Sequence, residues 1–473
     1  MPLEGSYAIW NNRGGTGKTT LTYHLANKYA LKHPDKTILL IDMCPQADLS
    51  HAFLGDDENN LDYVSQIGTL KKDAMLIGDQ KIPKTISGYL DIYTSIGLPQ
   101  NVDPRTFLTN VSKFNPLLPR NLYLLCGDTS IELIARSLEI KRNSTILSNA
   151  FGSNAWKAVT TALKHFIRKI SERKGIKLVV FIDTNSVFSI ITEIALCAAD
   201  KLLIPINDEH LHRNGFEYMF ALLYGFSQPS NVYYYYRHLS LYYRANEYDV
   251  KLPKIHLILN KLTKNNSNNN NNSNNSLKPI TTNGDNNNNN KPDSELRWEF
   301  IYDLLKKFPH VFQLNNNNRV PETIEEFKNE FLIEIGFEQA TTNIAREAVR
   351  SHSPLLSVKN PNNVRPIITV TNSSATAVSS TKTSGYSSIQ QTPSASSSSS
   401  ASSATTSITQ SNHINSNVNS NRVINNTTTY PCPTRLIVTN NDVAIKRNND
   451  DNNVEITSAI MFDKILDKIV DRL

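Results

Sequence analysis

Short, uniformly apolar runs recur along the first 264 residues of the chain. Because they do not alternate apolar with polar residues, each run is expected to be a strand buried on both faces. The segments between them place apolar residues at helical spacing, so helices would cover the sheet. This pattern predicts an α/β fold with a mostly parallel central sheet and helices on both faces. The expected strands are Tyr7–Asn12, Thr37–Asp42, Asn121–Cys126, Leu178–Asp183, Leu202–Ile206 and Ile255–Asn260.

Helical spacing of apolar residues continues beyond this region and reaches the end of the chain. It predicts one further helix that follows residue 183 and runs to Ala199. The other expected helices are Lys18–Lys32, Ala155–Ser171, Glu295–Lys307, Thr323–Ile335, Asn343–Arg350 and Ile456–Leu473.

The composition is uneven along the chain. Hydrophobic residues make up 39% and charged residues 19%, and both values are low for a globular protein. The deficit is local, because Asn, Ser and Thr fill residues 265–292 and 358–433. Such segments bury too little apolar surface to offset the entropy of ordering. We therefore expect one α/β domain that carries two disordered inserts.

Charge and cysteine usage limit the function classes. A formal net charge of +6 is too small to indicate a nucleic-acid partner by itself. The four cysteines, Cys44, Cys126, Cys197 and Cys432, lie far apart, so neither a disulfide framework nor a cysteine-rich metal site is expected. The chain has no secretory leader pattern and no apolar run of membrane-spanning length. We expect a reduced protein of the cytoplasm.

The strongest local signal is the segment Asn12–Thr20, which follows an apolar run and opens a helix. Its glycines allow a tight turn that aims several backbone N–H groups at one anion, and the helix N-terminus adds its dipole. Lys18 would contact the β- and γ-phosphates, and Thr19 would bind Mg²⁺. A glycine-rich turn that only opens a structural helix is the alternative, and the Gly-Lys-Thr-Thr register disfavours it. The predicted nucleotide-binding residues are Arg13, Gly14, Gly15, Thr16, Gly17, Lys18, Thr19 and Thr20.

This loop resembles the deviant Walker A loop of the ParA/MinD (Soj-like) family of P-loop ATPases, whose form is K-G-G-x-G-K-T-[ST]. Ile41–Ser50 is similar to the switch segment of that family, D-x-D-P-Q-x-N-x-[ST]. Ile182–Thr184 resembles the end of its Walker B strand, and Ala198–Pro205 resembles the strand that comes next. The motifs keep their order across about residues 5–264 and match more weakly to 357.

The resemblance implies a P-loop NTPase fold that binds ATP with Mg²⁺ and forms a nucleotide-dependent homodimer. Members of this family position cargo on DNA, which some bind non-specifically, or on a membrane. By resemblance, Lys18, Asp42, Asp183 and Arg13 would be catalytic, and Thr19, Asp42 and Asp183 would hold the metal. Asn260 lies where family members often contact adenine. A structural asparagine that caps the end of the strand explains that residue equally well.

The sequence departs from the family pattern at three places that would affect the rate of ATP hydrolysis. Arg13 replaces the signature lysine that reaches across the dimer, and Cys44 replaces the second aspartate of the switch segment. Asn185 and Ser186 replace a proline pair. A thiol is a weak hydrogen-bonding group, so slow hydrolysis is expected. The alternatives are an ATP-gated binding module with little or no hydrolysis, or a MinD-like membrane-associated ATPase.

The C-terminal helix bears on the membrane question. Its apolar stripe is flanked by three aspartates, Asp463, Asp467 and Asp471, and by as many basic residues, so its side chains carry no net charge. A membrane-surface helix would carry an excess of Lys and Arg. We therefore expect the helix to pack on the ATPase domain, and we regard membrane binding as the less favoured alternative.

These expectations define five segments. Residues 1–264 form a ParA-like ATPase core, 265–292 an Asn-rich insert, and 293–357 the C-terminal part of the domain. Residues 358–433 form a second disordered segment, and 434–473 carry the amphipathic helix.

Overall fold

The computed structural model describes fourteen stretches of the chain, and it divides the chain into two compact units. One unit comprises Met1–Ile367 with Asn448–Leu473. The other, Ile368–Arg447, lies outside the described residues, as do both predicted inserts, 265–292 and 358–433. The described residues are 3–55, 64, 75–77, 80–95, 102–144, 154–173, 175–207, 213–226, 235–263, 293–315, 318–337, 339–350, 352 and 449–473.

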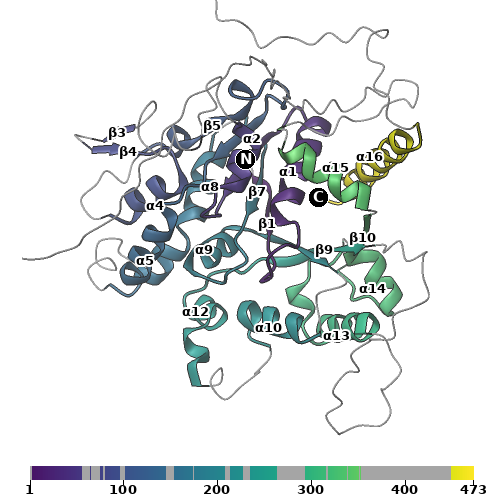
Figure 1. Ribbon diagram of the computed structural model, residues 1–473. Coiled ribbons are helices and arrows are strands. Elements are labelled where there is room, and N and C mark those ends of the chain that lie inside the picture. The colour runs from purple at the N-terminus through teal and green to yellow at the C-terminus, as the bar shows by residue number, and fades with distance from the viewer. Residues whose placement is uncertain are drawn as a thin grey trace, which may run out of the picture. The chain divides into compact units, whose positions relative to one another are not determined.

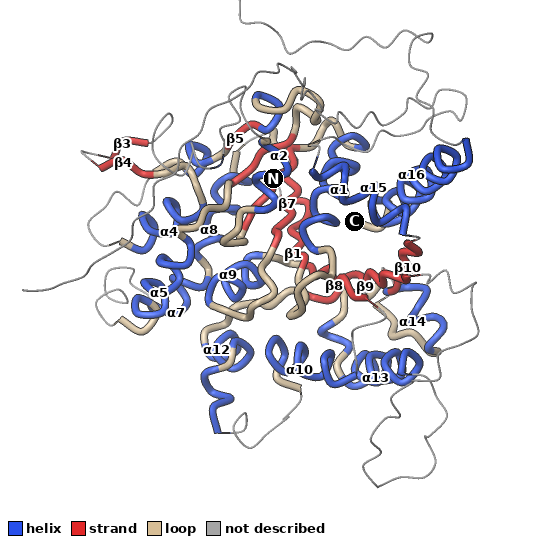
Figure 2. Tube along the Cα trace, viewed as in Figure 1, coloured by secondary structure: helices blue, strands red, loops and turns tan. Residues whose placement is uncertain are grey.

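A central sheet of eight strands in the order β10-β9-β8-β1-β7-β2-β6-β5 organises the first unit (Figure 2). All neighbouring strands run parallel except the short edge strand β5, which is antiparallel to β6. A separate hairpin pairs β3 (Met75–Ile77) with β4 (Gln80–Ile82). The predicted, mostly parallel α/β sheet is thereby confirmed. Its strands are β1 Leu3–Ile9, β2 Thr37–Asp42, β5 Thr109–Asn110, β6 Leu122–Leu125, β7 Leu178–Asp183, β8 Lys201–Asn207, β9 Lys254–Thr263 and β10 Leu332–Phe337.

Helices cover both faces of this sheet (Figure 1). Successive side chains of a strand point to opposite faces, and β7 shows this directly. Val180 and Ile182 belong to one buried cluster, and Val179 and Phe181 belong to the other. The second cluster contains α1 (Lys18–Lys32), α2 (Asp48–Leu54), α15 (Gln339–Arg350) and α16 (Asn449–Val470).

The opposite face is covered by the remaining helices. They are α4 (Ile86–Thr94), α5 (Ile131–Lys141), α7 (Ala155–Thr160), α8 (Ala162–Ser171), α9 (Ile190–Ala198), α10 (Arg213–Tyr224), α12 (Leu241–Glu247), α13 (Asp293–Lys307) and α14 (Ile324–Phe331). Short 3-10 turns span Pro104–Phe107, Val111–Lys113, Arg237–Leu239 and Pro309–Val311.

The predicted helix Thr323–Ile335 is wrong in its last part. The helix ends at Phe331, and Leu332–Phe337 forms the edge strand β10, which pairs with β9 from Leu332 opposite Ile258. Ile333 and Ile335 are buried while Glu334 between them is exposed, and this alternation has the period of a strand. A short run of apolar residues is compatible with both the helical and the strand period. Pairing with β9 determines that this segment is a strand.

Several other elements differ from the predicted ones in their bounds or continuity. The first strand runs from Leu3 to Ile9 and excludes Trp10–Asn12, which open the following loop. The predicted helix Ala155–Ser171 is broken at Thr161, whose hydroxyl donates to the Lys157 carbonyl at 2.7 Å, a contact that often bends helices. The last helix begins at Asn449 rather than Ile456. Among the described residues, no helix is both long and apolar enough to cross a bilayer.

Candidate phosphate-binding site

The loop between β1 and α1 has the backbone geometry that its glycines predict. Gly15 has a φ of 75° and Gly17 a φ of 87°, and both values lie in the left-handed region that favours glycine. Helix α1 begins at Lys18 with no side-chain cap and no acidic residue in its first turn. The first N–H groups of the helix therefore have no capping side chain, and they make this end a ready site for an anion.

Asn11 anchors the start of the loop, and the sequence reasoning missed it. Its side-chain amide donates to the Pro205 carbonyl at 2.8 Å and accepts from the backbone N–H of Arg13 at 2.9 Å. Asn11 is fully buried, so these bonds tie the loop rigidly to the end of β8. On the other side, the Thr184 hydroxyl donates to the Ile9 carbonyl at 2.6 Å. An asparagine before a glycine-rich turn gives no signal that would reveal this bridge.

Lys18 folds back over the loop. Its Nζ donates to the Arg13 carbonyl at 2.9 Å, and the residue is 8% exposed. Burial lowers the pKa of Lys18, and the nearby Asp183 carboxylate opposes that shift. The Arg13 side chain lies exposed on the outer surface of the same loop. Lys18 is thus inside the loop, where a phosphate would be held, and Arg13 faces outward.

Asp183 connects β7 to the first turns of α1. One carboxylate oxygen accepts from the Thr19 hydroxyl at 2.7 Å, and the other accepts from the Thr22 hydroxyl at 3.1 Å. Asp183 is fully buried, and this burial, with the charge of Asp42, raises its pKa to about 7. Thr22, which also donates to the Lys18 carbonyl, is a contact that the sequence reasoning did not assign.

Asp42 lies beside Asp183, because β2 and β7 pair in register at these two residues. Its hydrogen bonds, however, go to the loop that follows β2. One oxygen accepts from the Cys44 N–H at 3.0 Å, and the other accepts from the N–H and the hydroxyl of Ser50 at 2.9 and 2.7 Å. Burial raises the pKa of Asp42 to about 6. Asp42 therefore fixes the conformation of residues 44–50, next to the loop that Lys18 closes.

Gly127 completes this arrangement. Its N–H donates to the Ser50 hydroxyl at 2.9 Å, and a Cβ at this position would lie 2.9 Å from the Asp42 carboxyl carbon. Only glycine fits there without displacing Asp42. Ser50 ends the segment that resembles the switch segment, but its bond to Gly127 was not predicted, since β6 meets β2 only in the folded sheet.

The donor set fits Mg²⁺. The Thr19 hydroxyl and the Asp183 carboxylate are hard oxygen ligands that already touch, and Asp42 supplies a second carboxylate nearby. Within the described ranges, no group of three or more His, Cys, Asp or Glu residues could hold a metal ion by itself. Mg²⁺ does not require one, because it is usually held by one or two carboxylates, substrate phosphates and water.

Cys44 contacts Asp42 from the segment after β2, and Asn260 belongs to β9. Cys44 is half-buried, and burial together with the Asp42 charge raises its pKa to about 12. Asn260 is buried, and its side-chain oxygen has no hydrogen-bond partner among the described residues. The strand β9 continues past Asn260 to Thr263, because Lys261–Thr263 pair with β10. The interpretation of Asn260 as the cap of a strand end is therefore wrong.

Comparison with known proteins agrees with this geometry. Residues 6–232 match a family model described as AAA_31, AAA domain. No curated protein matches the chain. The loop geometry and the family model both indicate a P-loop protein, and they are independent observations.

Three solved structures are distantly similar. Apo McdA from Cyanothece is 14% identical with a TM-score of 0.39, over 74% of this chain and 91% of that chain. A putative plasmid partition protein from Borrelia burgdorferi B31 bound to AMPPNP is 16% identical with a TM-score of 0.33, over 69% and 96%. Cobyrinic acid a,c-diamide synthase from Mycobacterium smegmatis with an ATP analog and magnesium is 16% identical with a TM-score of 0.32, over 54% and 74%. Residues 6–232 are thus similar to the AAA_31 family, whose members are ParA/MinD-type P-loop ATPases.

Proposed function

We propose that the chain binds Mg-ATP at the loop of residues 12–20 and acts as an ATP-dependent dimeric switch that positions cargo. The observation that carries the proposal is the 2.7 Å contact between Thr19 and Asp183 beside an uncapped helix N-terminus. It brings hard oxygen ligands to the place where the loop N–H groups would hold phosphate. The AAA_31 match supports the same reading.

Each residue of the site then has a distinct task. Lys18 would exchange its bond to the Arg13 carbonyl for the β- and γ-phosphates. Thr19 and Asp183 would hold Mg²⁺, which neutralises charge on the phosphates when it is bound. Asp42 would keep residues 44–50 in place through Ser50. Asn260, with its unsatisfied side-chain oxygen, is proposed to accept a hydrogen bond from the base.

Hydrolysis is proposed to be slow. A Cys44 thiol whose pKa is raised to about 12 stays protonated at neutral pH, so it cannot orient an attacking water as a carboxylate would. The same observation favours a second candidate, an ATP-gated binding module with little or no turnover. Single-turnover hydrolysis with purified protein separates the two, because the module would release no phosphate on the time scale of its ATP-dependent binding.

Dimerisation is proposed to run through Arg13. Its side chain is exposed on the loop, where a second copy could present its own nucleotide. Light scattering with ATP, with ADP and without nucleotide tests this. Arg13→Ala should weaken the ATP-bound dimer more than it weakens ATP binding, and Arg120→Ala, an exposed arginine before β6, is the matched control. One mass in every nucleotide state would contradict a nucleotide-dependent dimer.

Such a switch would act on DNA or on a membrane, and binding assays can tell the two apart. Non-specific DNA binding is one candidate. Membrane binding is less favoured, because the apolar residues Phe462, Leu466 and Ile469 of α16 are already buried against the domain. ATP-dependent co-sedimentation with DNA and with anionic liposomes, for the full chain and for a deletion of 456–473, separates these outcomes. The proposed domain comprises 1–264 and 293–357, with 434–473 attached to it.

A further inference from the structure

The outer edge of the sheet at β10 borders an open groove of about 820 Å³. β10 is the last strand of the sheet, and its only strand neighbour among the described residues is β9 (Figure 2). Leu332, Ile333 and Glu334, three successive residues of this strand, line the groove. Successive side chains of a strand point to opposite faces. The groove therefore runs along the edge of β10 rather than over one of its faces.

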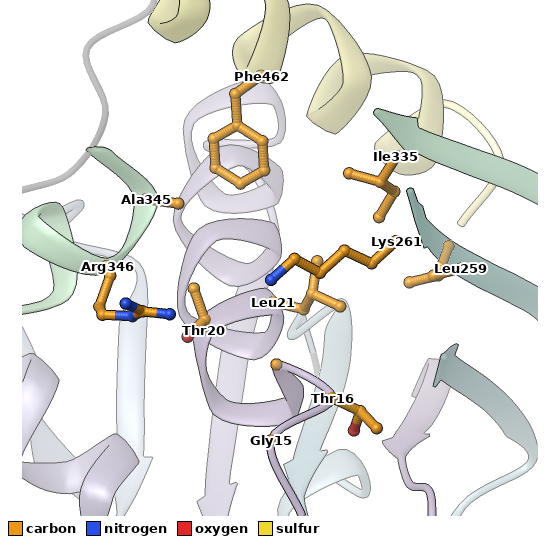
Figure 3. A pocket seen from close by; sticks show the side chains of 11 residues that line it. Gly15, Thr16, Thr20, Leu21, Leu259, Lys261, Ile335, Ala345, Arg346 and Phe462 are labelled. Carbon is orange, nitrogen blue, oxygen red and sulfur yellow. The ribbon is translucent and has the colours of Figure 1, made fainter. Parts of the chain in front are cut away.

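A helix from each layer forms a wall of this groove. Figure 3 shows Ile335 of β10 and Phe462 of α16 lining one pocket beside α1. Ile335 also belongs to the same buried cluster as Leu466 and Ile469, so α16 is fixed over one face of β10. A groove between two helices beside a strand edge has the shape that an added strand requires. The wall residues are Glu325, Lys328 and Asn329 from α14, and Lys468, Asp471 and Arg472 from the end of α16.

The edge of β10 offers backbone groups for pairing. Within the part of the chain that the structure describes, residues 333–335 make no backbone hydrogen bond outside the ladder with β9. An edge strand of this kind presents N–H and C=O groups that an extended peptide can satisfy. The side chains of such a peptide would then meet the two walls alternately.

The α14 side of the groove carries no unpaired cation among the described residues. Lys328 pairs with Glu325 at 3.1 Å. Glu334 is exposed, and it points away from α16 because its neighbours Ile333 and Ile335 point toward that helix. This side of the groove is therefore neutral to acidic.

The α16 wall, in contrast, carries two cations that lack a partner. Asp471 is engaged by Lys32 at 2.7 Å. Lys468 and Arg472 make no side-chain hydrogen bond or ion pair with any described residue. Arg472 is half-buried, and burial lowers its pKa while the charge of Glu330 opposes that shift. Because a charge that is partly withdrawn from water is costly without a partner, this wall is suited to carboxylates.

We propose that the groove along β10 binds an extended acidic segment of a partner protein, which joins the sheet as a further strand. Alternate residues of the segment are acidic and face Lys468 and Arg472. Residues two apart in a strand are separated by about 6.6 Å, and residues four apart in a helix by about 6 Å, so successive acidic residues can each meet one cation. In the strand order, β10 is three strands away from β1, where the phosphate loop begins. The inference is therefore independent of nucleotide binding.

The first test measures the binding of capped synthetic peptides to the full wild-type chain by fluorescence anisotropy. Thr-Glu-Val-Glu-Val-Glu-Thr should bind at least tenfold more tightly than Thr-Lys-Val-Lys-Val-Lys-Thr. Two further versions of the acidic peptide carry N-methyl groups at alternate residues, one version in each phase. A strand bonds to its neighbour through alternate residues, so one version should lose at least tenfold in affinity and the other should bind as the parent does.

The second test changes the α16 wall. Arg472→Gln should weaken binding of the acidic peptide at least about tenfold, because hydrogen bonds between charged groups are the stronger ones. Lys468→Ala should weaken it about two- to fivefold, since this lysine is exposed. Lys464→Ala, which alters an exposed lysine of α16 outside the groove lining, is the matched control. Thermal unfolding checks that each variant is folded, and the N-methyl comparison stays decisive if Arg472→Gln is unstable.

The outcomes distinguish the possible occupants. If wild type does not bind the acidic peptide, the charges only protect the edge against pairing, and the inference fails. Equal affinity for the two N-methylated versions would overturn strand addition. If wild type self-associates, and Arg472→Gln abolishes that association without changing peptide binding, a second copy occupies the groove and the inference is wrong. No arm of the test contains nucleotide, so its result does not depend on the phosphate loop.

Discussion

The Thr19 hydroxyl donates to the Asp183 carboxylate at 2.7 Å and so joins the first turn of α1 to the end of β7. In the paired strand β2, Asp42 stands directly beside Asp183 but bonds to the loop that contains Cys44 and Ser50. The two aspartates are therefore neighbours in the sheet but bond to different segments. Asp183 bonds to the first turns of α1, and Asp42 bonds to residues 44 and 50 of the segment after β2.

Asp183→Asn should weaken Mg-ATP binding by about 10–100-fold, because an amide is a poorer Mg²⁺ ligand and cannot hold both threonines. ATP binding in EDTA should change little. Calorimetry with and without Mg²⁺ measures both quantities. Asp35→Asn, which alters an exposed carboxylate paired with Lys177, is the control. Equal losses with and without Mg²⁺ would argue against a metal role for Asp183.

Cys44→Asp should raise the rate of ATP hydrolysis, because it supplies a carboxylate where the wild-type thiol stays protonated. A positioned general base or water-orienting group typically contributes about 10²–10⁴-fold, and an unoptimised replacement should recover only the lower part of that range. Cys44→Ser, of similar size and without a carboxylate, should match wild type. Rapid wild-type turnover that Cys44→Asp leaves unchanged would refute this prediction.

The ion pairs between α1 and α16 should differ in their contribution to stability. The side chains of Lys28 and Asp463 are 5% and 10% exposed, whereas those of Lys32 and Asp471 are 32% and 68% exposed. Asp463→Ala removes the 2.7 Å partner of a buried lysine, so it should cost at least about 2 kcal/mol in the free energy of unfolding. Asp471→Ala should cost less than about 1 kcal/mol. Urea denaturation tests this order, and equal costs would contradict it.

His24 should make stability depend on pH in one window. Burial lowers its pKa to about 4, against about 6.5 in an unfolded chain, although its hydrogen bond to the Ala345 carbonyl favours the charged form. Between these values the unfolded chain binds the extra proton. The contribution of His24 is thus fully present above pH 6.5 and is lost as pH falls toward 4, by up to about 1.4 kcal/mol per pH unit.

His24→Gln isolates this effect, because it keeps a donor for Ala345 but does not titrate. The raised pKa values of Asp42 and Asp183 act in the opposite direction in wild type and variant alike, so they cancel in the difference. The stability of wild type minus that of the variant should rise from pH 4 to 6.5 and be constant above that. A difference that is flat throughout would show that His24 is not held neutral.

The sequence predicted those parts of the site that are encoded locally. A glycine-rich turn between a strand and a helix needs no distant partner, and β2 and β7 appear at their predicted bounds because uniform apolar runs admit few alternatives. Asn11 and Gly127 were missed for the opposite reason. Their roles depend on Pro205 and Asp42, which only the folded sheet brings to them.

The edge strand β10 illustrates a second limit. Leu332, Ile333 and Ile335 continue the apolar spacing of α14, and nothing in the local sequence ends the helix at Phe331. Pairing with β9 makes this segment a strand, and β9 precedes residues 265–292 in the sequence. The contacts of α16 with Lys28 and His24 are equally long-range, so its amphipathic pattern predicted a buried face but not which residues cover it.

The most direct test of the central claim is the affinity of Lys18→Ala for Mg-ATP. Lys18 is held inside the loop by the Arg13 carbonyl, and its ammonium would make charged hydrogen bonds to phosphate worth about 1.5–3 kcal/mol. The affinity should therefore fall by more than about tenfold, while circular dichroism shows an intact fold and the exposed control Lys177→Ala binds as wild type does. An undiminished affinity for Mg-ATP in folded Lys18→Ala would contradict a phosphate-binding role for this loop.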